Sequence, residues 1–160
     1  MNVSVVDLRH GVKIPRITNI DRFLAEQNSL GDVPLVYVAG PYRAQTEHEV
    51  WDHIMEARAV GIEINRLGGF AIVPHLLGLL MGGVLADPHR WLRYDLTLMS
   101  KLNAAFFMPS WKDSEGARVE RRFCQVSGLP IYDDLAELGT FIRAWPSMPF
   151  LPPGWEEETD

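Results

Sequence analysis

The sequence predicts an α/β fold, a single-domain open parallel sheet of four to five strands with helices on both faces. Short apolar runs that end at glycine, proline or polar residues are typical of strands buried on both faces. Longer segments with apolar residues at every third or fourth position alternate with these runs and predict amphipathic helices. Such an alternation is characteristic of parallel strands joined by right-handed crossovers.

Length and composition fit one domain with a hydrophobic core, since the chain has 160 residues, 47% hydrophobic and 22% charged. The net charge of -6 argues against a nucleic-acid polymer as partner, because duplex binding needs clustered Lys and Arg. A small anionic ligand in a local basic pocket is compatible with this charge. The single cysteine, Cys124, excludes an intramolecular disulfide and a cysteine-based zinc site, and we expect it to be a small buried hydrophobic residue.

The two ends of the chain differ from the middle. We expect residues 1–33 to be a peripheral N-terminal extension, with a short strand at 3–8 and a short helix at 19–27. Residues 34–145 are expected to form the α/β domain, and residues 146–160 a proline-rich acidic tail. No apolar run resembles a signal peptide or is long enough to cross a bilayer, so we expect a cytoplasmic protein with no membrane partner.

The first strand is predicted at residues 35–39, an apolar and β-branched run. Thr46 and Glu49 have the spacing of a capping box, and they begin a helix that stops at Gly68. The second strand follows at 70–73. A strand, a helix and a strand at this spacing predict a parallel crossover.

Residues 76–84 are apolar and rich in glycine, and they predict either a short helix or a mobile cover. Asp87 and Pro88 are the residue types of an N-cap and a first helical turn, and they predict a helix that runs to Lys101. The remaining elements are expected in the order strand, helix, strand, helix at 104–108, 114–127, 129–132 and 134–145. Together they describe a Rossmann-like or flavodoxin-like sheet.

In such sheets the ligand lies beyond the carboxyl ends of the strands, near a reversal of the strand order. This rule selects the loops at 40–43, 74–75 and 109–114. Arg43, in the first of these loops, could bind a phosphate or a carboxylate, or it could be a surface residue.

The third loop leads into a helix capped by Asp113 or Ser114. The unpaired amides of that helix start favour an anion beside Ser114 and Gly116, and glycine lets the backbone approach the anion closely. Glu120 follows on the same helix, either as a solvated residue or as a carboxylate that faces a phosphorylated sugar. Asp95, on the preceding helix, is a second carboxylate near this sheet end, unless it is a surface residue or pairs with Arg90 or Arg93. Two carboxylates are the minimum for breaking a glycosidic bond.

Several common motifs are absent from the sequence. The turn at Gly40 matches neither the dinucleotide-binding pattern nor the phosphate loop of NTPases, and there is no G-x-S-x-G elbow. His48 and His53 are five positions apart instead of the four of a zinc helix signature, so their rings should point apart. We therefore expect neither a metal nor another cofactor.

Three segments resemble the signatures of the nucleoside 2-deoxyribosyltransferase superfamily, and the likeness covers residues 35–132. These segments are Tyr37-Val38-Ala39-Gly40-Pro41-Tyr42-Arg43, Trp91-Leu92-Arg93-Tyr94-Asp95 and Ser114-Glu115-Gly116-Ala117-Arg118-Val119-Glu120. The most specific part is the ordered set of an aromatic residue in the first strand, an aspartate on the middle helix and a Ser-x-Gly-x-x-x-Glu run. The superfamily includes the 2′-deoxynucleoside 5′-monophosphate N-glycosidases.

The resemblance implies roles for three side chains. Glu120 matches the nucleophile that attacks the sugar C1′, and Tyr37 matches an aromatic residue that orients it. Asp95 matches the carboxylate that contacts the sugar hydroxyls or assists departure of the base. An ionised carboxylate beside C1′ stabilises oxocarbenium character and can form a glycosyl-enzyme ester. Attack by water then gives a hydrolase, and attack by another base gives a transferase.

The resemblance also implies a substrate class. Arg43 and Ser114 favour the monophosphate N-glycosidases, whose pattern at these positions holds a phosphate. His75 either faces the base or caps the end of the second strand. The residues expected to contact the substrate are Gly40, Tyr42, Arg43, His75, Ser114 and Gly116.

The first hypothesis is an N-glycosidase that hydrolyses the base-sugar bond of a (deoxy)ribonucleoside 5′-monophosphate. The alternatives are a nucleoside 2-deoxyribosyltransferase that exchanges bases, and a non-catalytic nucleotide-binding module. The superfamily tends to form dimers, so a homodimer or a higher homo-oligomer is expected. Five tryptophans and the apolar segment 76–85 supply material for such an interface.

Overall fold

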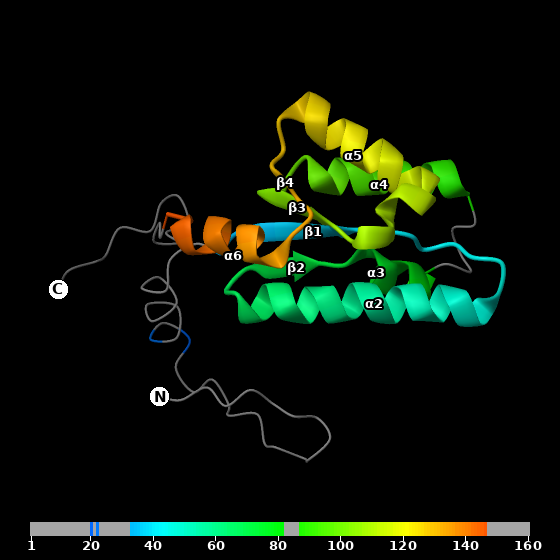
Figure 1. The fold of residues 1–160 in the computed structure, drawn as a ribbon, viewed down its shortest axis with the longest axis horizontal. Helices are drawn as coiled ribbons and strands as arrows, with labels where there is room; N and C mark the ends of the chain where they lie inside the picture. Colours follow the sequence, from blue (N-terminus) through cyan, green and yellow to red (C-terminus); the bar gives the residue numbers. More distant parts are fainter. Residues whose placement is uncertain (1–19, 21, 23–32, 82–86, 147–160) are drawn as a thin grey trace, which may run out of the picture. The chain divides into compact units, whose positions relative to one another are not determined.

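The computed structural model describes residues 20, 22, 33–81 and 87–146 (Figure 1). The chain divides into two units, one of Val33–Trp145 and one of Met1–Asp32 with Pro146–Asp160. All the elements discussed below belong to Val33–Trp145. The predicted N-terminal strand lies outside the described residues, as do most of the predicted N-terminal helix and of the acidic tail.

The unit Val33–Trp145 contains a four-stranded, all-parallel sheet with the strand order β2-β1-β3-β4. Its elements are β1 (Leu35–Ala39), α2 (Glu47–Arg66), β2 (Phe70–Ile72), α3 (Pro74–Met81), α4 (Pro88–Met99), β3 (Ala104–Phe107), the 3-10 helix η2 (Pro109–Asp113), α5 (Glu115–Ser127), β4 (Ile131–Tyr132) and α6 (Leu135–Ala144). The predicted α/β class and open parallel sheet are confirmed. The chain passes from β1 to β2 on one side and then to β3 on the other, so the strand order reverses between β1 and β3.

Helices cover both faces of the sheet. Successive side chains along a buried strand point to opposite faces, so neighbouring residues of one strand pack against different helices. Val36 and Phe106 belong to a core cluster that includes residues of α2 and α6. Tyr37 and Phe107 belong to a second cluster that includes Met99 of α4 and residues of α5. Figure 1 shows the same arrangement, with α2 on one side of the sheet and α4 and α5 on the other.

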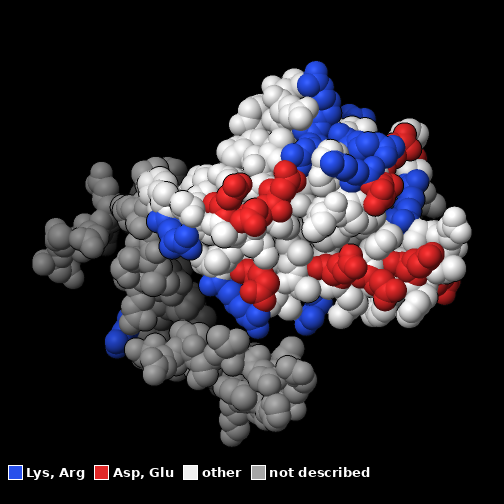
Figure 2. All heavy atoms as spheres, viewed as in Figure 1, with Lys and Arg blue, Asp and Glu red and all other residues white. Residues whose placement is uncertain are grey.

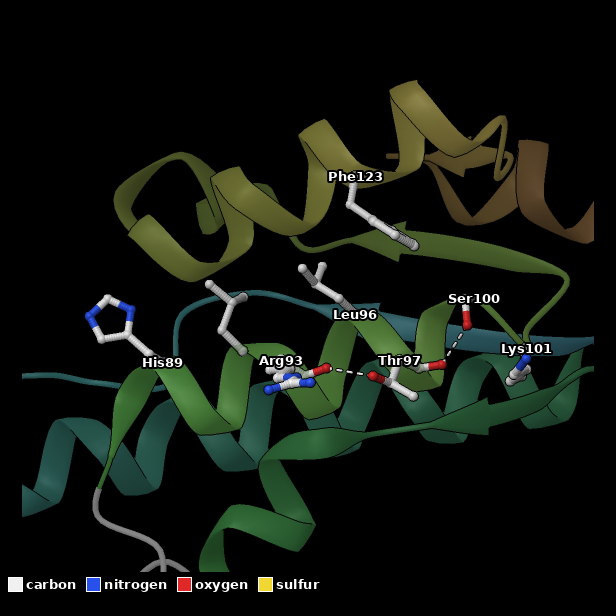
Figure 3. A pocket seen from close by; sticks show the side chains of 8 residues that line it. His89, Arg93, Leu96, Thr97, Ser100, Lys101 and Phe123 are labelled. Atoms are coloured by element: carbon white, nitrogen blue, oxygen red, sulfur yellow. Dashed lines mark hydrogen bonds between the residues drawn. The ribbon is translucent and has the colours of Figure 1, made fainter.

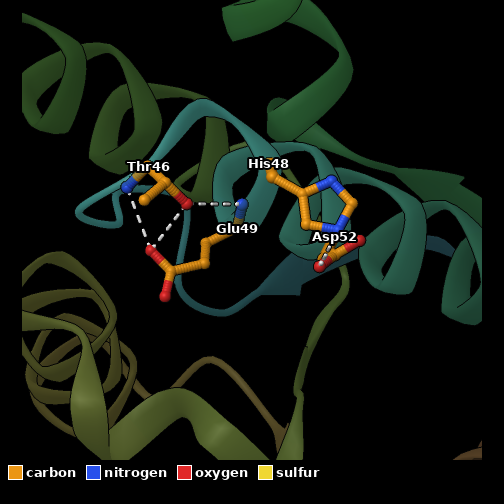
Figure 4. A network of polar contacts seen from close by, with 4 residues as sticks. All are labelled: Thr46, His48, Glu49 and Asp52. Atoms are coloured by element: carbon orange, nitrogen blue, oxygen red, sulfur yellow. Dashed lines mark hydrogen bonds and ion pairs between the residues drawn. The ribbon is translucent and has the colours of Figure 1, made fainter.

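α2 begins at the predicted capping box (Figure 4). The hydroxyl of Thr46 accepts a hydrogen bond from the amide of Glu49 at 3.2 Å, and the Glu49 carboxylate accepts one from the amide of Thr46 at 2.9 Å. Two amides that the helix itself leaves unpaired are thereby satisfied. The capping box therefore fixes the point where the loop after β1 becomes a helix.

Two other helices also begin at predicted caps. Asp87 caps α4 and accepts from the amide of His89 at 3.0 Å. Ser114 rather than Asp113 caps α5, and its hydroxyl accepts from the amide of Ala117 at 3.2 Å. The segment that leads to this cap was expected to be a polar loop, but it forms the 3-10 helix η2. The apolar segment after β2 is helical as far as Met81. Of the two predicted alternatives for this segment, the short helix is therefore the one observed up to that residue.

Charge is distributed unevenly over this unit. Figure 2 shows acidic side chains along α2 and basic side chains over α5. The acidic residues on α2 include Glu47, Glu49 and Asp52, whereas α5 carries the exposed Arg118 and Arg122. Among the described residues, no helix is long and apolar enough to cross a membrane.

Candidate active site

Glu120 is a buried carboxylic acid in contact with a buried phenol. Its side chain belongs to α5 and is only 6% exposed, and Tyr37 of β1 is 1% exposed. The Tyr37 hydroxyl donates a buried hydrogen bond of 2.8 Å to Oε1 of Glu120. The alternative that Glu120 is a solvated helix residue is therefore wrong. A carboxylate can accept further hydrogen bonds, so this single bond leaves Glu120 with acceptor capacity for a ligand.

Asp95 is a second carboxyl group beside the same phenol. It lies on α4, is half-buried, and lies close enough to the Tyr37 hydroxyl for that hydroxyl to lower its pKa. The charges of Glu120 and Asp95 both act on the hydroxyl of Tyr37. In the described part of the chain, no ion pair joins Asp95 to Arg90 or Arg93, the partners that the sequence left open. The structure therefore brings together side chains from β1, α4 and α5.

Burial shifts the titration of both carboxyl groups upward. Burial raises the pKa of Glu120 to about 8, the hydrogen bond from Tyr37 opposes this rise, and the charge of Asp95 adds to it. Burial also raises the pKa of Asp95 to about 6, and the nearby Tyr37 hydroxyl opposes this rise. Interacting carboxyl groups titrate as a pair. With pKa values of about 6 and about 8, the pair holds one proton near neutral pH.

Two carboxyl groups that share one proton can act in two ways at once. The ionised group can attack or stabilise a developing cation, and the protonated group can donate to a leaving group. Burial raises the pKa of Tyr37 well above its ordinary value, with the charges of Glu120 and Asp95 adding to the rise, so its hydroxyl keeps its proton. Burial raises the pKa of the Cys124 thiol to about 12, which fits the small buried residue predicted from sequence and not a nucleophile.

The loops at the carboxyl ends of the strands contact one another, as the parallel sheet predicts. A Cβ placed on Gly40 would lie 2.3 Å from the terminal methyl of Met108, which follows β3, so only glycine fits this contact without a shift of Met108. Nε2 of His75, which follows β2, lies 3.0 Å from the carbonyl oxygen of Pro41. The loop after β1 therefore packs against residues that follow both neighbouring strands.

The predicted anion-binding residues have open sides. Arg43 is exposed, and it has no hydrogen bond or ion pair within the described residues. The nearest atom to a Cβ placed on Gly116 would be Oγ of Ser114, at 3.8 Å, so the outer side of Gly116 is open. The Ser114 hydroxyl accepts from a helix amide and still has its own proton to donate. Ser114 and Gly116 thus lie together at the start of α5, and no hydrogen bond in the described part of the chain joins them to Arg43.

His75 and Tyr42 contact each other, and the His75 ring is buried while Tyr42 is partly exposed. His75 is 5% exposed, and the two rings meet edge to face with their centroids 6.0 Å apart. Burial lowers the pKa of His75, so the ring is neutral at neutral pH. This environment favours a structural role for His75, but its ring contacts the loop after β1 instead of capping the end of β2.

The helix that carries Glu120 is held by side chains that no sequence motif indicated. Arg121 stacks its guanidinium over Trp111 at 4.4 Å from the ring centroid and over Phe107 at 5.0 Å. It also forms a two-pronged ion pair with Asp133. These contacts tie α5 to η2, β3 and the segment after β4, and so fix the helix that carries Glu120. The partners lie far apart in the sequence, and nothing in the local pattern pointed to them.

A shallow groove lies elsewhere on the same face of the sheet. It has a volume of about 490 Å³ and runs between α4 and α5 (Figure 3). Its lining residues are His89, Leu92, Arg93, Leu96, Thr97, Ser100, Lys101 and Phe123. Tyr37, Asp95 and Glu120 do not line it, so the groove is separate from the carboxyl pair. Within the described residues, no cluster of three or more His, Cys, Asp or Glu side chains could hold a metal ion.

Fold and site together define an α/β domain in which a buried glutamate and a half-buried aspartate lie beside one tyrosine at the reversal of the strand order. No protein-family model matches the chain, and no curated protein matches it either. A function is therefore inferred from the residues and their geometry.

Proposed function

We propose that the protein is an N-glycosidase that hydrolyses the base-sugar bond of a (deoxy)ribonucleoside 5′-monophosphate. The observation that carries this proposal is the 2.8 Å hydrogen bond from Tyr37 to the buried Glu120, with Asp95 beside the same hydroxyl. The resemblance of three sequence segments to the nucleoside 2-deoxyribosyltransferase superfamily supports the same roles.

Because Glu120 has the higher pKa, it holds the shared proton more often than Asp95 does, and the reactive form is the one in which this proton has moved to Asp95. In the first step of that form, the ionised Glu120 attacks C1′ of the sugar while the bond from C1′ to the base nitrogen breaks. The departing base takes the proton of the carboxyl pair from Asp95. A covalent bond now joins C1′ to an oxygen of Glu120, and Asp95 is ionised. The Tyr37 hydroxyl donates to Oε1 of Glu120 and so orients the nucleophile.

In the second step, water attacks C1′ and gives its proton to Asp95. The ester bond to Glu120 breaks and the carboxylate is restored, so each cycle consumes one water and releases one base and one sugar phosphate. The two displacements invert C1′ twice, and the configuration is retained. Neither step needs a metal ion or an organic cofactor.

The polar residues around the sheet edge support a phosphorylated substrate. Arg43 is exposed and has no partner within the described residues, and a guanidinium binds phosphate oxygens in a two-pronged geometry. Ser114 and Gly116 offer a hydroxyl proton and an open backbone at the start of α5. A 5′-phosphate bound by these groups would hold the sugar next to Glu120.

The proposal is tested by incubating the protein with each common nucleoside and nucleoside monophosphate and measuring free base by chromatography. We expect the wild type to release base from at least one monophosphate, and Glu120→Gln to reduce the rate by at least about a hundredfold, as expected for a missing nucleophile. Glu56→Gln is the matched control, because Glu56 is an exposed glutamate on α2. Undiminished release by Glu120→Gln would contradict the mechanism.

The same assay separates the two alternatives. Addition of a free acceptor base would give a new nucleotide with a transferase, but only sugar phosphate with a hydrolase. Calorimetric binding of a monophosphate without release of base over a long incubation would indicate a nucleotide-binding module and would contradict the proposed activity.

A further inference from the structure

Two histidines hold successive carbonyl groups of the loop at residues 40–43. Nε2 of His75, on α3, lies 3.0 Å from the carbonyl oxygen of Pro41. Nδ1 of His53, on α2, lies 3.3 Å from the carbonyl oxygen of Tyr42. The spacing of His48 and His53 in the sequence raised only the question of a metal site, and the His53 ring is instead directed toward this loop.

The carbonyl contacts fix the tautomer of each ring. A carbonyl oxygen can only accept, so the ring nitrogen that faces it must carry a hydrogen. His75 is therefore the Nε2-H tautomer and His53 the Nδ1-H tautomer. In the neutral His75 ring, Nδ1 is then an acceptor, and it has no partner within the described residues. The two histidines hold the loop through opposite nitrogens.

Packing restrains the same loop from further sides. The ring of Tyr42 lies edge-on to His75, and it packs so closely on α3 that a Cβ on Gly78 would lie 3.1 Å from ring atoms. Beyond the loop, the amides of Gln45 and Thr46 donate to the Glu49 carboxylate at 3.1 and 2.9 Å. The loop is thus held before and after Arg43, while Arg43 itself is exposed.

We propose that His53 and His75 are positioning residues that hold the loop at 40–43 in the conformation in which Arg43 binds the 5′-phosphate of the substrate. This inference rests on the proposed function for its ligand. Each histidine acts through the backbone and does not touch the reacting atoms. Loss of either hydrogen bond would let the carbonyl and the adjoining Arg43 move, which weakens phosphate binding and leaves the carboxyl pair intact.

The tautomers can be measured without any substrate. Long-range proton-nitrogen correlation spectra of the full chain at about pH 8, where a free imidazole is neutral, distinguish the two forms. We expect His75 to carry its hydrogen on Nε2 and His53 on Nδ1. The opposite tautomer at either residue would overturn the clamp, whether or not the protein is a glycosidase.

Amide side chains provide matched variants, because the amide nitrogen of glutamine can replace Nε2 of histidine and that of asparagine can replace Nδ1. His75→Gln and His53→Asn keep a donor at the required position, whereas His75→Asn and His53→Gln remove it. For a nucleoside monophosphate, we expect the second pair to raise KM about tenfold, the loss typical of one hydrogen bond, with kcat nearly unchanged. Arg43→Ala removes the guanidinium itself and sets the size of the full effect.

The corresponding nucleoside without phosphate is the control substrate, and all four histidine variants should process it alike. Equal impairment of all four variants with the monophosphate, or of none, would overturn the positioning role. If the wild type releases no base from any monophosphate, the proposed function fails and the phosphate part of this inference fails with it. The tautomer spectra would then still decide whether the histidines hold the loop.

Discussion

Glu120 is 6% exposed and its hydrogen-bond donor is a tyrosine, and burying its charged form in this environment lowers the stability of the fold. The charged form loses its hydration on burial, and one hydrogen bond from a neutral phenol only partly replaces it. A second half-buried carboxyl group, Asp95, makes the charged state more costly still. Such an arrangement weakens the fold, which is typical of residues that are positioned for chemistry.

The proposed roles predict how base release depends on pH. Below about pH 6 both carboxyl groups are protonated and there is no nucleophile, and above about pH 8 both are ionised and there is no proton for the base. A plot of kcat/KM against pH should therefore be bell-shaped with its maximum between these values. Tyr37→Phe removes the hydroxyl that lowers both pKa values, so both limbs should move to higher pH as the maximum falls about tenfold or more. A profile that is flat from pH 5 to pH 9 would contradict the shared proton.

At the scale of elements, the local sequence predicted where the helices begin. Thr46, Asp87 and Ser114 begin helices where capping residues predict them, because a cap is a local interaction. The site was less predictable. The burial of Glu120 depends on which side of α5 faces the sheet, and the loop contacts of His53 and His75 depend on how α2 and α3 pack beside β1. Contacts between elements of this kind leave no local sequence pattern.

Two helical glycines should respond in opposite ways to alanine. Within the described residues, no atom lies nearer than 3.8 Å to a Cβ on Gly116, so Gly116→Ala should keep or raise the unfolding free energy by up to about 1 kcal/mol. The same methyl group would crowd the predicted anion site and raise KM for the monophosphate. A Cβ on Gly61 of α2 would lie 2.7 Å from Val73, and overpacking of this kind costs about 1 to 3 kcal/mol. Gly61→Ala should therefore lose stability in urea unfolding without a change in KM.

The contrast between the two glycines separates packing from binding. An increase in KM for Gly61→Ala similar to that for Gly116→Ala would show that the effect on phosphate binding is indirect. A large loss of stability for Gly116→Ala would show that packing at the start of α5 does oppose a side chain at this position.

At the scale of the whole molecule, the sheet topology creates the site. Tyr37 lies on β1, and Asp95 and Glu120 lie on the helices before and after β3. Because β1 and β3 are neighbours and α4 and α5 cover the same face, side chains 83 residues apart form one hydrogen bond. The order of the elements, which the sequence predicted, thus determines which carboxyl groups can meet.

The buried carboxyl group also predicts the pH dependence of global stability. The pKa of Glu120 rises from about 4.5 in an unfolded chain to about 8 in the fold, so between these values the native state holds a proton that the unfolded state has lost. Its contribution to stability is complete below about pH 4.5 and declines by about 1.4 kcal/mol per pH unit until about pH 8. Glu120→Gln has no proton to lose, so its unfolding free energy should exceed that of the wild type by several kcal/mol at pH 8 to 9 and approach it near pH 4.5. Glu56→Gln should follow the wild type throughout, because that exposed side chain of α2 is solvated in both states. Urea unfolding at a series of pH values measures all three proteins, and a constant difference between wild type and Glu120→Gln would show that Glu120 is not buried as a titrating acid.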